Sequence, residues 1–145
     1  MSRFTIRVYG LLVHNGHVLV ADEIIKGRRI TKFPGGGLEY GEGTKDCLVR
    51  EIDEEMGVKA FDMQHFYTTD FFQRSTFHSE EMQVMSIYYT FRVHSPDTLP
   101  VAAAPFAFGE EKEGAEVFRW LPLPGAEADV HLPIDKVVLR MLAVA

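Results

Sequence analysis

Three consecutive glycines, with an acid-rich helical segment a few residues after them, constrain this chain more than any other feature. The preceding residues are β-like, and Pro34 with Gly35–Gly37 is expected to interrupt regular strand pairing. Residues 45–56 then place Leu48, Ile52 and Met56 at i, i+4 and i+8. This spacing predicts a helix with a single apolar stripe, and the glycine that follows is a typical terminator.

The predicted helix carries three carboxylates on one face. Glu51, Glu54 and Glu55 stand at i, i+3 and i+4, within one turn. Like charges at this spacing repel one another, and a divalent cation removes the repulsion. Clustered hard oxygen ligands favour Mg²⁺ or Mn²⁺. The alternative, a solvated acidic helix face, remains open from the helix alone, and the glycine-rich loop favours the metal because it lets a ligand approach the backbone closely.

At this point residues 36–58 resemble a known family signature, the Nudix box, G-x5-E-x7-R-E-U-x-E-E-x-G-U with U an aliphatic residue. Every defined position is matched, by Gly36, Glu42, Arg50, Glu51, Ile52, Glu54, Glu55, Gly57 and Val58. The resemblance implies an α/β (α+β) fold, the family's αβα sandwich with a mixed β-sheet between helices. It also implies a single Nudix hydrolase domain over residues 1–145.

The resemblance also implies the roles of the box residues in a Mg²⁺-dependent hydrolysis, with Mn²⁺ as the alternative ion. The metal ligands would be the three helix glutamates, Glu51, Glu54 and Glu55, and the backbone carbonyl of Gly35. Arg50 would orient a glutamate, and Glu42 would support the site from the loop. Water activated by the metal would attack the diphosphate of a nucleoside diphosphate linked to another group.

Two parts of the candidate site are open on sequence alone. The general base is assigned to Glu54, but family members differ, and the acidic loop offers alternatives at Glu110, Glu111, Glu113 and Glu116, of which Glu113 and Glu116 are kept as an extra base or ligand. The segment before and within the box supplies the candidate substrate-binding residues Lys32, Phe33, Pro34 and Gly36. Gly43 stands where many family members have a serine or threonine, so Thr44 is expected to cap the helix one residue later.

Strand-like segments surround the box on both sides. Residues 4–13 and 17–21 flank an Asn15-Gly16 pair and are expected to form a hairpin, and 29–33 a further strand. Residues 58–72, 82–93 and 116–121 are also β-rich, and 96–114 is expected to be a surface loop. Apolar residues at helical spacing from Ile134 to Leu142 predict a final amphipathic helix that covers a sheet face.

Charge and composition limit the partners. The chain has 145 residues and a net charge of −6, so no basic surplus exists for nucleic acid or an anionic membrane. No apolar run reaches the roughly 18 residues that span a bilayer. The single cysteine, Cys47, fits a reducing compartment, which predicts the cytoplasm, and its place on the helix predicts core packing. The expected partner is a small nucleotide-type substrate, and a homodimer is left open.

The flanking groups of the diphosphate are not identified. The family's markers for ADP-ribose and for diadenosine polyphosphates are absent from residues 70–75. Asp135 stands at the start of the last predicted helix, where some base-sanitising family members place an amide that reads the purine edge. It is interpreted instead as an acid favoured by a helix N-terminus. The alternative function is a catalytically silent Nudix-fold module that senses a nucleotide. An isoprenoid diphosphate isomerase is disfavoured because no additional cysteine is present.

Overall fold

The β-rich segments build two sheets in two units of the chain. The computed structural model describes residues 3–77 and 81–144. One unit combines Met1–Leu12 with Pro34–Leu99, and the second combines Val13–Phe33 with Pro100–Ala145. We call them unit 1 and unit 2. The residues of the box all lie in unit 1.

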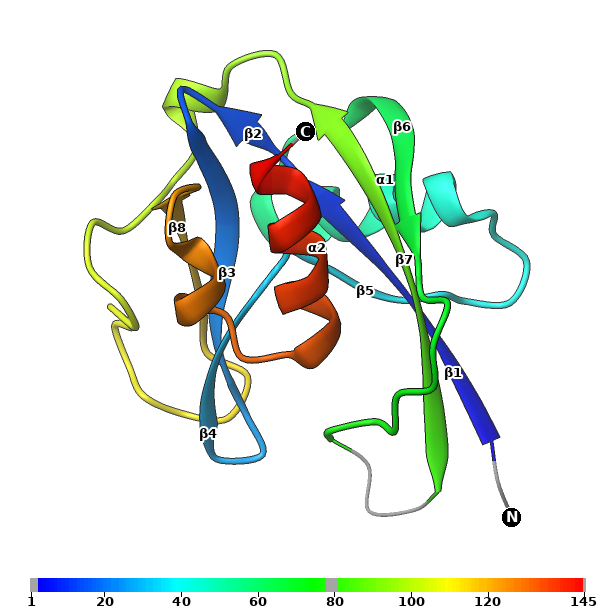
Figure 1. Ribbon diagram of the computed structural model, residues 1–145. Coiled ribbons are helices and arrows are strands. Elements are labelled where there is room, and N and C mark those ends of the chain that lie inside the picture. The colour runs from blue at the N-terminus through cyan, green and yellow to red at the C-terminus, as the bar shows by residue number, and fades with distance from the viewer. Residues whose placement is uncertain (1–2, 78–80, 145) are drawn as a thin grey trace. The chain divides into compact units, whose positions relative to one another are not determined.

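The sheet of unit 1 is mixed, as the resemblance implies. Its strand order is β5-β1-β7-β6. The strands are β1 (Arg3–Leu11), β5 (Gly35–Gly37), β6 (Phe61–Thr68) and β7 (Met82–Arg92). The two long strands, β1 and β7, run parallel and side by side (Figure 1), while β5 and β6 pair antiparallel at the edges. Val8, Leu11 and Tyr88 are completely buried in this unit.

The expectation that the glycines interrupt strand pairing is wrong. Gly35–Gly37 form the edge strand β5, with Val8 opposite Gly36 and Arg7 opposite Gly37. Glycine loses side-chain packing in a strand but keeps its backbone donor and acceptor, so it can complete a ladder that a long neighbouring strand offers. The three glycines are therefore held in place by β1.

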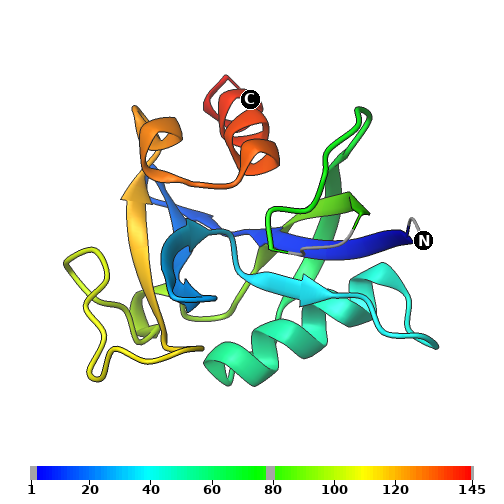
Figure 2. The same cartoon turned by 90° about the horizontal axis from the view of Figure 1, so that it is seen from below.

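Helix α1 (Thr44–Met56) packs its apolar stripe against this sheet (Figure 2). Cys47, Leu48, Ile52 and Met56 are its buried residues, so the predicted stripe and the core packing of Cys47 are confirmed. The predicted cap is wrong. Asp46 accepts a hydrogen bond at 3.1 Å from the backbone N–H of Gly43, while the Thr44 hydroxyl lies 2.6 Å from the hydroxyl of Tyr89.

The second sheet belongs to unit 2. It contains β2 (Val13–His14), β3 (His17–Ile25), β4 (Arg28–Lys32) and β8 (Glu116–Pro122), with β3 between β4 and β8 and all pairs antiparallel. Asn15 and Gly16 have φ of 51° and 76°, which confirms the tight turn. The predicted strand 4–13 is divided, however, because β1 pairs in unit 1 and only β2 forms the hairpin with β3.

Short helices complete each unit. Unit 1 contains η1 (Pro96–Thr98), and unit 2 contains η2 (Ala126–Asp129) and α2 (Pro133–Ala143). The helix α2 buries Ile134, Val138, Leu139 and Leu142, as its apolar spacing predicts. Asp135 lies in its first turn and is completely buried. Within the part of the chain that is described, no helix is long and apolar enough to cross a membrane.

Candidate active site

The backbone of β5 lies directly against a carboxylate of α1. A Cβ atom placed on Gly36 would stand only 2.3 Å from Oε1 of Glu51, much closer than atoms can approach. Any side chain at this position would push the carboxylate away. The Glu51 carboxylate, whose side chain is 15% exposed, therefore keeps this position only while residue 36 is glycine.

Arg50 connects the loop, the edge strand and the helix. Its Nε and Nη2 donate to the two carboxylate oxygens of Glu42 at 3.1 and 2.7 Å, a bidentate pair. Nη2 also donates to the carbonyl of Gly37 at 3.1 Å. Nη1 donates to Glu51 at 3.0 Å and reaches Glu54 at 3.4 Å. The sequence predicted that Arg50 orients a glutamate, and the tightest partner is Glu42, with Glu51 as the box ligand that it also holds.

Two hydrogen bonds between Glu39 and Glu42 hold the loop before the helix. The N–H of Glu39 donates to the Glu42 carboxylate at 2.9 Å, and the N–H of Glu42 donates to the Glu39 carbonyl at 3.3 Å. Sequence reasoning did not identify these contacts or the carbonyl of Gly37. The only available signal was the three-residue spacing from Glu39 to Glu42, which suits a turn. The loop is thus held in one conformation beside α1.

The charges of this cluster are strongly stabilised. Hydrogen bonds from Arg50, and then from the backbone of Glu39, lower the pKa of Glu42 from 4.5 to about 2. The hydrogen bond to Glu42 in turn raises the pKa of Arg50 above its ordinary value. Both groups are therefore charged throughout the neutral range, and Glu42 serves as a fixed anion that positions Arg50.

This lowered pKa predicts how stability depends on pH. Ionised Glu42 stabilises the folded state above the unfolded pKa of 4.5, and this contribution is lost as the pH falls toward about 2. In urea unfolding, the stability difference between the wild type and Glu42→Gln should be constant above pH 5 and should shrink between pH 4.5 and pH 2. A difference that stays the same down to the lowest pH would contradict the role of the ionised carboxylate.

The other two box glutamates differ in exposure. The Glu54 side chain is 59% exposed, whereas Glu55 is half-buried and its Oε2 atom is buried. Among residues 3–77 and 81–144, no three His, Cys, Asp or Glu side chains gather closely enough to hold a metal ion. The donor chemistry fits a hard cation, since three carboxylates share one helix face, but Glu54 and Glu55 must rotate to meet Glu51 at one ion.

Cys47 lies beside the same cluster and is completely buried. Its thiol lies 3.5 Å from the carbonyl of Gly37, and burial raises its pKa to about 12. A thiol with this pKa is almost entirely protonated near neutral pH and is a poor nucleophile. The residue fills space where the helix meets the sheet.

The candidate substrate-binding residues are divided between the two units. Lys32 and Phe33 belong to unit 2, where Lys32 pairs with Glu23 at 3.3 Å and Phe33 is completely buried. Pro34 and Gly36 belong to unit 1 and are also buried. The ring of Phe33 thus has no exposed surface on which a base could stack. The assignment of these residues to the substrate remains a prediction.

The acidic candidates outside the box are engaged in unit 2. The Glu113 carboxylate accepts hydrogen bonds from the backbone N–H groups of Lys26 at 2.6 Å and Gly27 at 2.9 Å. Glu111 pairs with Arg29. These contacts connect the acidic loop to the turn between β3 and β4 and to β4 itself. Glu116 lies in β8, opposite Glu23 in β3. Oε2 of Glu110 lies 3.7 Å from Nζ of Lys112.

The contact of Glu113 with the turn predicts a structural effect. Glu113→Ala removes two charge-assisted hydrogen bonds at an exposed site, which should lower the free energy of unfolding by about 1 kcal/mol. The rate of hydrolysis by the folded enzyme should change less than twofold. Thermal or urea unfolding and a steady-state assay test this separately, with Glu110→Ala as the control for an acid of the same loop. A loss of kcat by orders of magnitude at unchanged stability would instead make Glu113 the general base.

Comparison with known proteins identifies the domain family and the fold. The family model for the NUDIX domain matches residues 1–142. The structure is similar to the Escherichia coli ORF135 protein, with a TM-score of 0.72 at 17% identity over 99% of this chain and 91% of that one. A NUDIX hydrolase from Nitrosomonas europaea matches with a TM-score of 0.71 at 17% identity, covering 97% and 88%.

A third similar structure is a MutT NUDIX hydrolase from Burkholderia pseudomallei. Its TM-score is 0.64 at 15% identity, over 94% of this chain and 96% of that one. No curated protein sequence matches the chain at a significant level. At these identities the structural matches establish the fold, and they do not identify a substrate.

Proposed function

The chain belongs to the Nudix hydrolase family, and we propose that it is a Mg²⁺-dependent enzyme that cleaves the diphosphate of a nucleoside diphosphate linked to another group. Mn²⁺ is the alternative ion. The observation that carries the proposal is the contact between β5 and α1, where the Glu51 carboxylate lies against the backbone of Gly36 and is held there by Arg50. A carboxylate fixed in this way is prepared to bind a cation beside β5.

The proposed chemistry assigns a role to each box residue. Glu51, Glu54, Glu55 and the Gly35 carbonyl would hold the divalent ion, which supplies activation of water and neutralises charge on the phosphate oxygens. Arg50 keeps Glu51 in place, and Glu42 keeps Arg50 in place. Water forms a bond to one phosphorus while the bond from that phosphorus to the bridging oxygen breaks. The proton of the water passes to the carboxylate of Glu54, our proposed general base.

A panel of nucleoside triphosphates, nucleotide sugars and dinucleoside diphosphates tests this proposal. The purified protein should release phosphate-containing products in the presence of Mg²⁺, and excess EDTA should abolish the release until Mg²⁺ is added back. Failure to hydrolyse any compound with either Mg²⁺ or Mn²⁺ would refute the proposed function.

The alternative is a Nudix-fold module that senses a nucleotide without hydrolysing it. It gains some support from the box glutamates, since within the described part of the chain no three acidic, histidine or cysteine side chains converge on a metal position. The complete set of box acids supports the enzyme more strongly. Tight nucleotide binding without metal-dependent turnover would favour the sensor. A cytoplasmic location and a small nucleotide-type substrate are also part of our proposal.

A further inference from the structure

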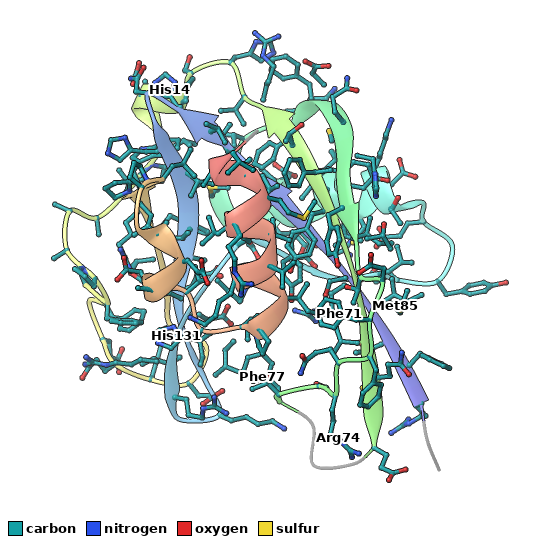
Figure 3. All side chains as sticks on the ribbon, in the orientation of Figure 1. His14, Phe71, Arg74, Phe77, Met85 and His131 are labelled. Atoms are coloured by element: carbon teal, nitrogen blue, oxygen red, sulfur yellow. The ribbon has the colours of Figure 1, made fainter. Side chains whose placement is uncertain are left out.

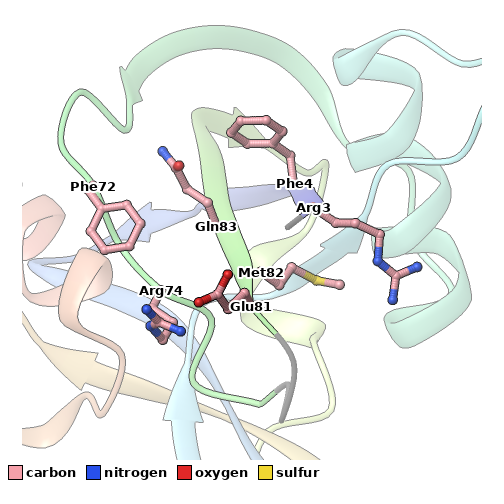
Figure 4. A pocket seen from close by; sticks show the side chains of 7 residues that line it. All are labelled: Arg3, Phe4, Phe72, Arg74, Glu81, Met82 and Gln83. Carbon is pink, nitrogen blue, oxygen red and sulfur yellow. The ribbon is translucent and has the colours of Figure 1, made fainter. Parts of the chain in front are cut away.

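A second feature of unit 1 is a small pocket outside the box. It lies where β1 and β7 begin and has a volume of about 200 Å³. Figure 4 shows its side chains, which come from β1, β7 and the segment between β6 and β7. The residues that matter for recognition are Arg3, Phe4, Phe72, Arg74, Glu81 and Gln83. None of them has a role in the proposed hydrolysis.

The floor of the pocket is held by backbone hydrogen bonds. The N–H of Arg3 donates to the carbonyl of Glu81 at 3.1 Å, which ties the start of β1 to the residue before β7. Residues 73–75 pair with the other side of β7, through hydrogen bonds of 2.8 and 2.9 Å. Phe4 and Arg74 are both paired with Gln83 in these ladders. The three side chains therefore start from adjacent positions on three neighbouring segments.

Two phenylalanine rings at this pocket are largely exposed to solvent. Phe4 is 72% exposed and Phe72 is 64% exposed. In Figure 4 their rings lie on either side of the Gln83 side chain, and Figure 3 places Arg74 on the segment that follows Phe71. Exposed single apolar residues are common, but two aromatic rings beside one pocket form a surface on which a flat ring can stack.

The polar groups of the pocket suit the edge of a nucleobase. Arg74 donates hydrogen bonds, Glu81 accepts them, and the amide of Gln83 does both. A base edge carries donors and acceptors together, and an Arg or a Gln side chain can each bind such an edge through two hydrogen bonds. Arg74 also places a positively charged group beside the pocket in a chain with a net charge of −6. This favours a base that is attached to phosphate.

The size of the pocket limits what it can hold. Sites for drug-sized ligands have volumes of roughly 300–1,000 Å³. A volume of about 200 Å³ accommodates one ring system and excludes a whole dinucleotide. The ligand must therefore place one flat group in the pocket and leave the rest outside.

The position of the pocket relates it to the proposed chemistry. Phe4 lies four residues before Val8 on β1, and Val8 is the partner of Gly36 in β5. Four residues of a strand span about 13 Å. An extended nucleoside diphosphate has a comparable length, so a diphosphate near Gly36 can place its base near Phe4.

We propose that this pocket is a base-recognition site for the nucleotide substrate. The base stacks on Phe4 and Phe72, and Arg74 and Gln83 bind its edge. This proposal rests on the proposed function, because it assigns the pocket to the same substrate. A separate mononucleotide that binds without being hydrolysed would use the same contacts. Steady-state kinetics distinguish the base of the substrate from the base of such an effector.

Direct binding tests the pocket without any reaction. The probes are AMP, GMP, CMP and UMP, titrated calorimetrically in EDTA against the wild type and three variants, Phe4→Ala, Phe72→Ala and Arg74→Ala. At least one mononucleotide should bind the wild type, and loss of either ring should weaken it about five- to tenfold, the lower part of the range for base–aromatic stacking. Arg92→Ala is the matched control, since Arg92 is an exposed arginine at the opposite end of β7, and its affinity should be unchanged.

Steady-state kinetics then identify the source of the base. If the pocket binds the substrate itself, Phe4→Ala and Phe72→Ala should raise KM by a similar factor and leave kcat within twofold. An unchanged KM together with weakened mononucleotide binding would overturn the assignment to the substrate and indicate a separate effector. Circular dichroism and unfolding midpoints of the variants verify that each one is folded.

Other outcomes overturn the pocket proposal outright. Mononucleotide binding that is equal in the wild type and all three pocket variants would place the base elsewhere. The wild type could instead bind no mononucleotide and sediment as a dimer that Phe4→Ala and Phe72→Ala convert to a monomer. This result would show that the surface is a contact between two copies of the chain. Mononucleotide binding that depends on the pocket in a protein that hydrolyses nothing would refute the proposed function and leave the pocket standing.

Discussion

Replacing Glu54 with glutamine should lower kcat of the metal-dependent hydrolysis by about two to four orders of magnitude, the usual contribution of a positioned general base. The change keeps the size of the side chain and removes its ability to accept a proton or to bind a cation as a carboxylate. The Glu54 side chain is 59% exposed and comes no closer than 3.4 Å to the guanidinium of Arg50. The substitution should therefore lower the free energy of unfolding very little. Thermal unfolding should therefore remain close to that of the wild type while turnover is nearly lost.

The neighbouring acid provides the control. Asp53 is exposed on the same helix but lies on a different face from Glu54. Asp53→Asn changes the charge of the helix by the same amount, so its kcat should stay within about threefold of the wild type. If both variants lose activity equally, general electrostatics explains the effect. If Glu54→Gln keeps full activity, the base and ligand roles of Glu54 are wrong.

The largest expected effect on stability concerns a buried ion pair in unit 2. Asp22 is completely buried, and its carboxylate accepts hydrogen bonds from Arg119 at 2.6 and 3.2 Å. The same carboxylate accepts from the hydroxyl of Thr31 at 2.7 Å and from the backbone N–H of Phe106 at 3.0 Å. It therefore joins β3, β4, β8 and the loop before β8.

Removing one partner should be costly. Asp22→Ala leaves the guanidinium of Arg119, which is 8% exposed, without its counter-charge. We expect a loss of about 3–5 kcal/mol in the free energy of unfolding, a large part of the roughly 5–15 kcal/mol that holds a typical domain folded. Urea unfolding followed by circular dichroism measures this loss.

Two further variants make this prediction specific. Glu127 and Arg140 form a pair at 2.8 Å with both side chains about half exposed, so Glu127→Ala should cost at most about 1 kcal/mol. The double variant Asp22→Leu with Arg119→Met removes both charges and should recover most of the loss. Equal costs for the buried and exposed pairs would show that burial does not determine the strength of this contact.

The parts of the site that were predictable depend on short separations along the chain. The stripe of Leu48, Ile52 and Met56 and the shared face of the three helix glutamates follow from the period of a helix. The match to the Nudix box added roles that spacing alone could not assign. The pairing of Arg50 with Glu42 crosses from helix to loop, whereas helical spacing relates Arg50 only to Glu54 at i+4.

Contacts between distant segments were not predictable. Pairing of Gly35–Gly37 with β1 depends on the long strand beside it, since glycines have little preference of their own for a strand. The division of residues 4–13 between two sheets, the contact of Glu113 with the turn at Lys26, and the pair of Asp22 with Arg119 join residues that no local pattern relates. Each depends on how the strands are ordered.

The sequence by itself thus determined that a glycine-rich segment precedes a helix with three carboxylates on one face, because helical periodicity and residue chemistry are local properties. Only the tertiary structure decided that the glycines form a strand, that Glu51 fills the space beside Gly36, and that Arg50 binds Glu42 most tightly. These arrangements arise from backbone pairing and close packing between segments far apart in the chain, which spacing along the sequence does not encode.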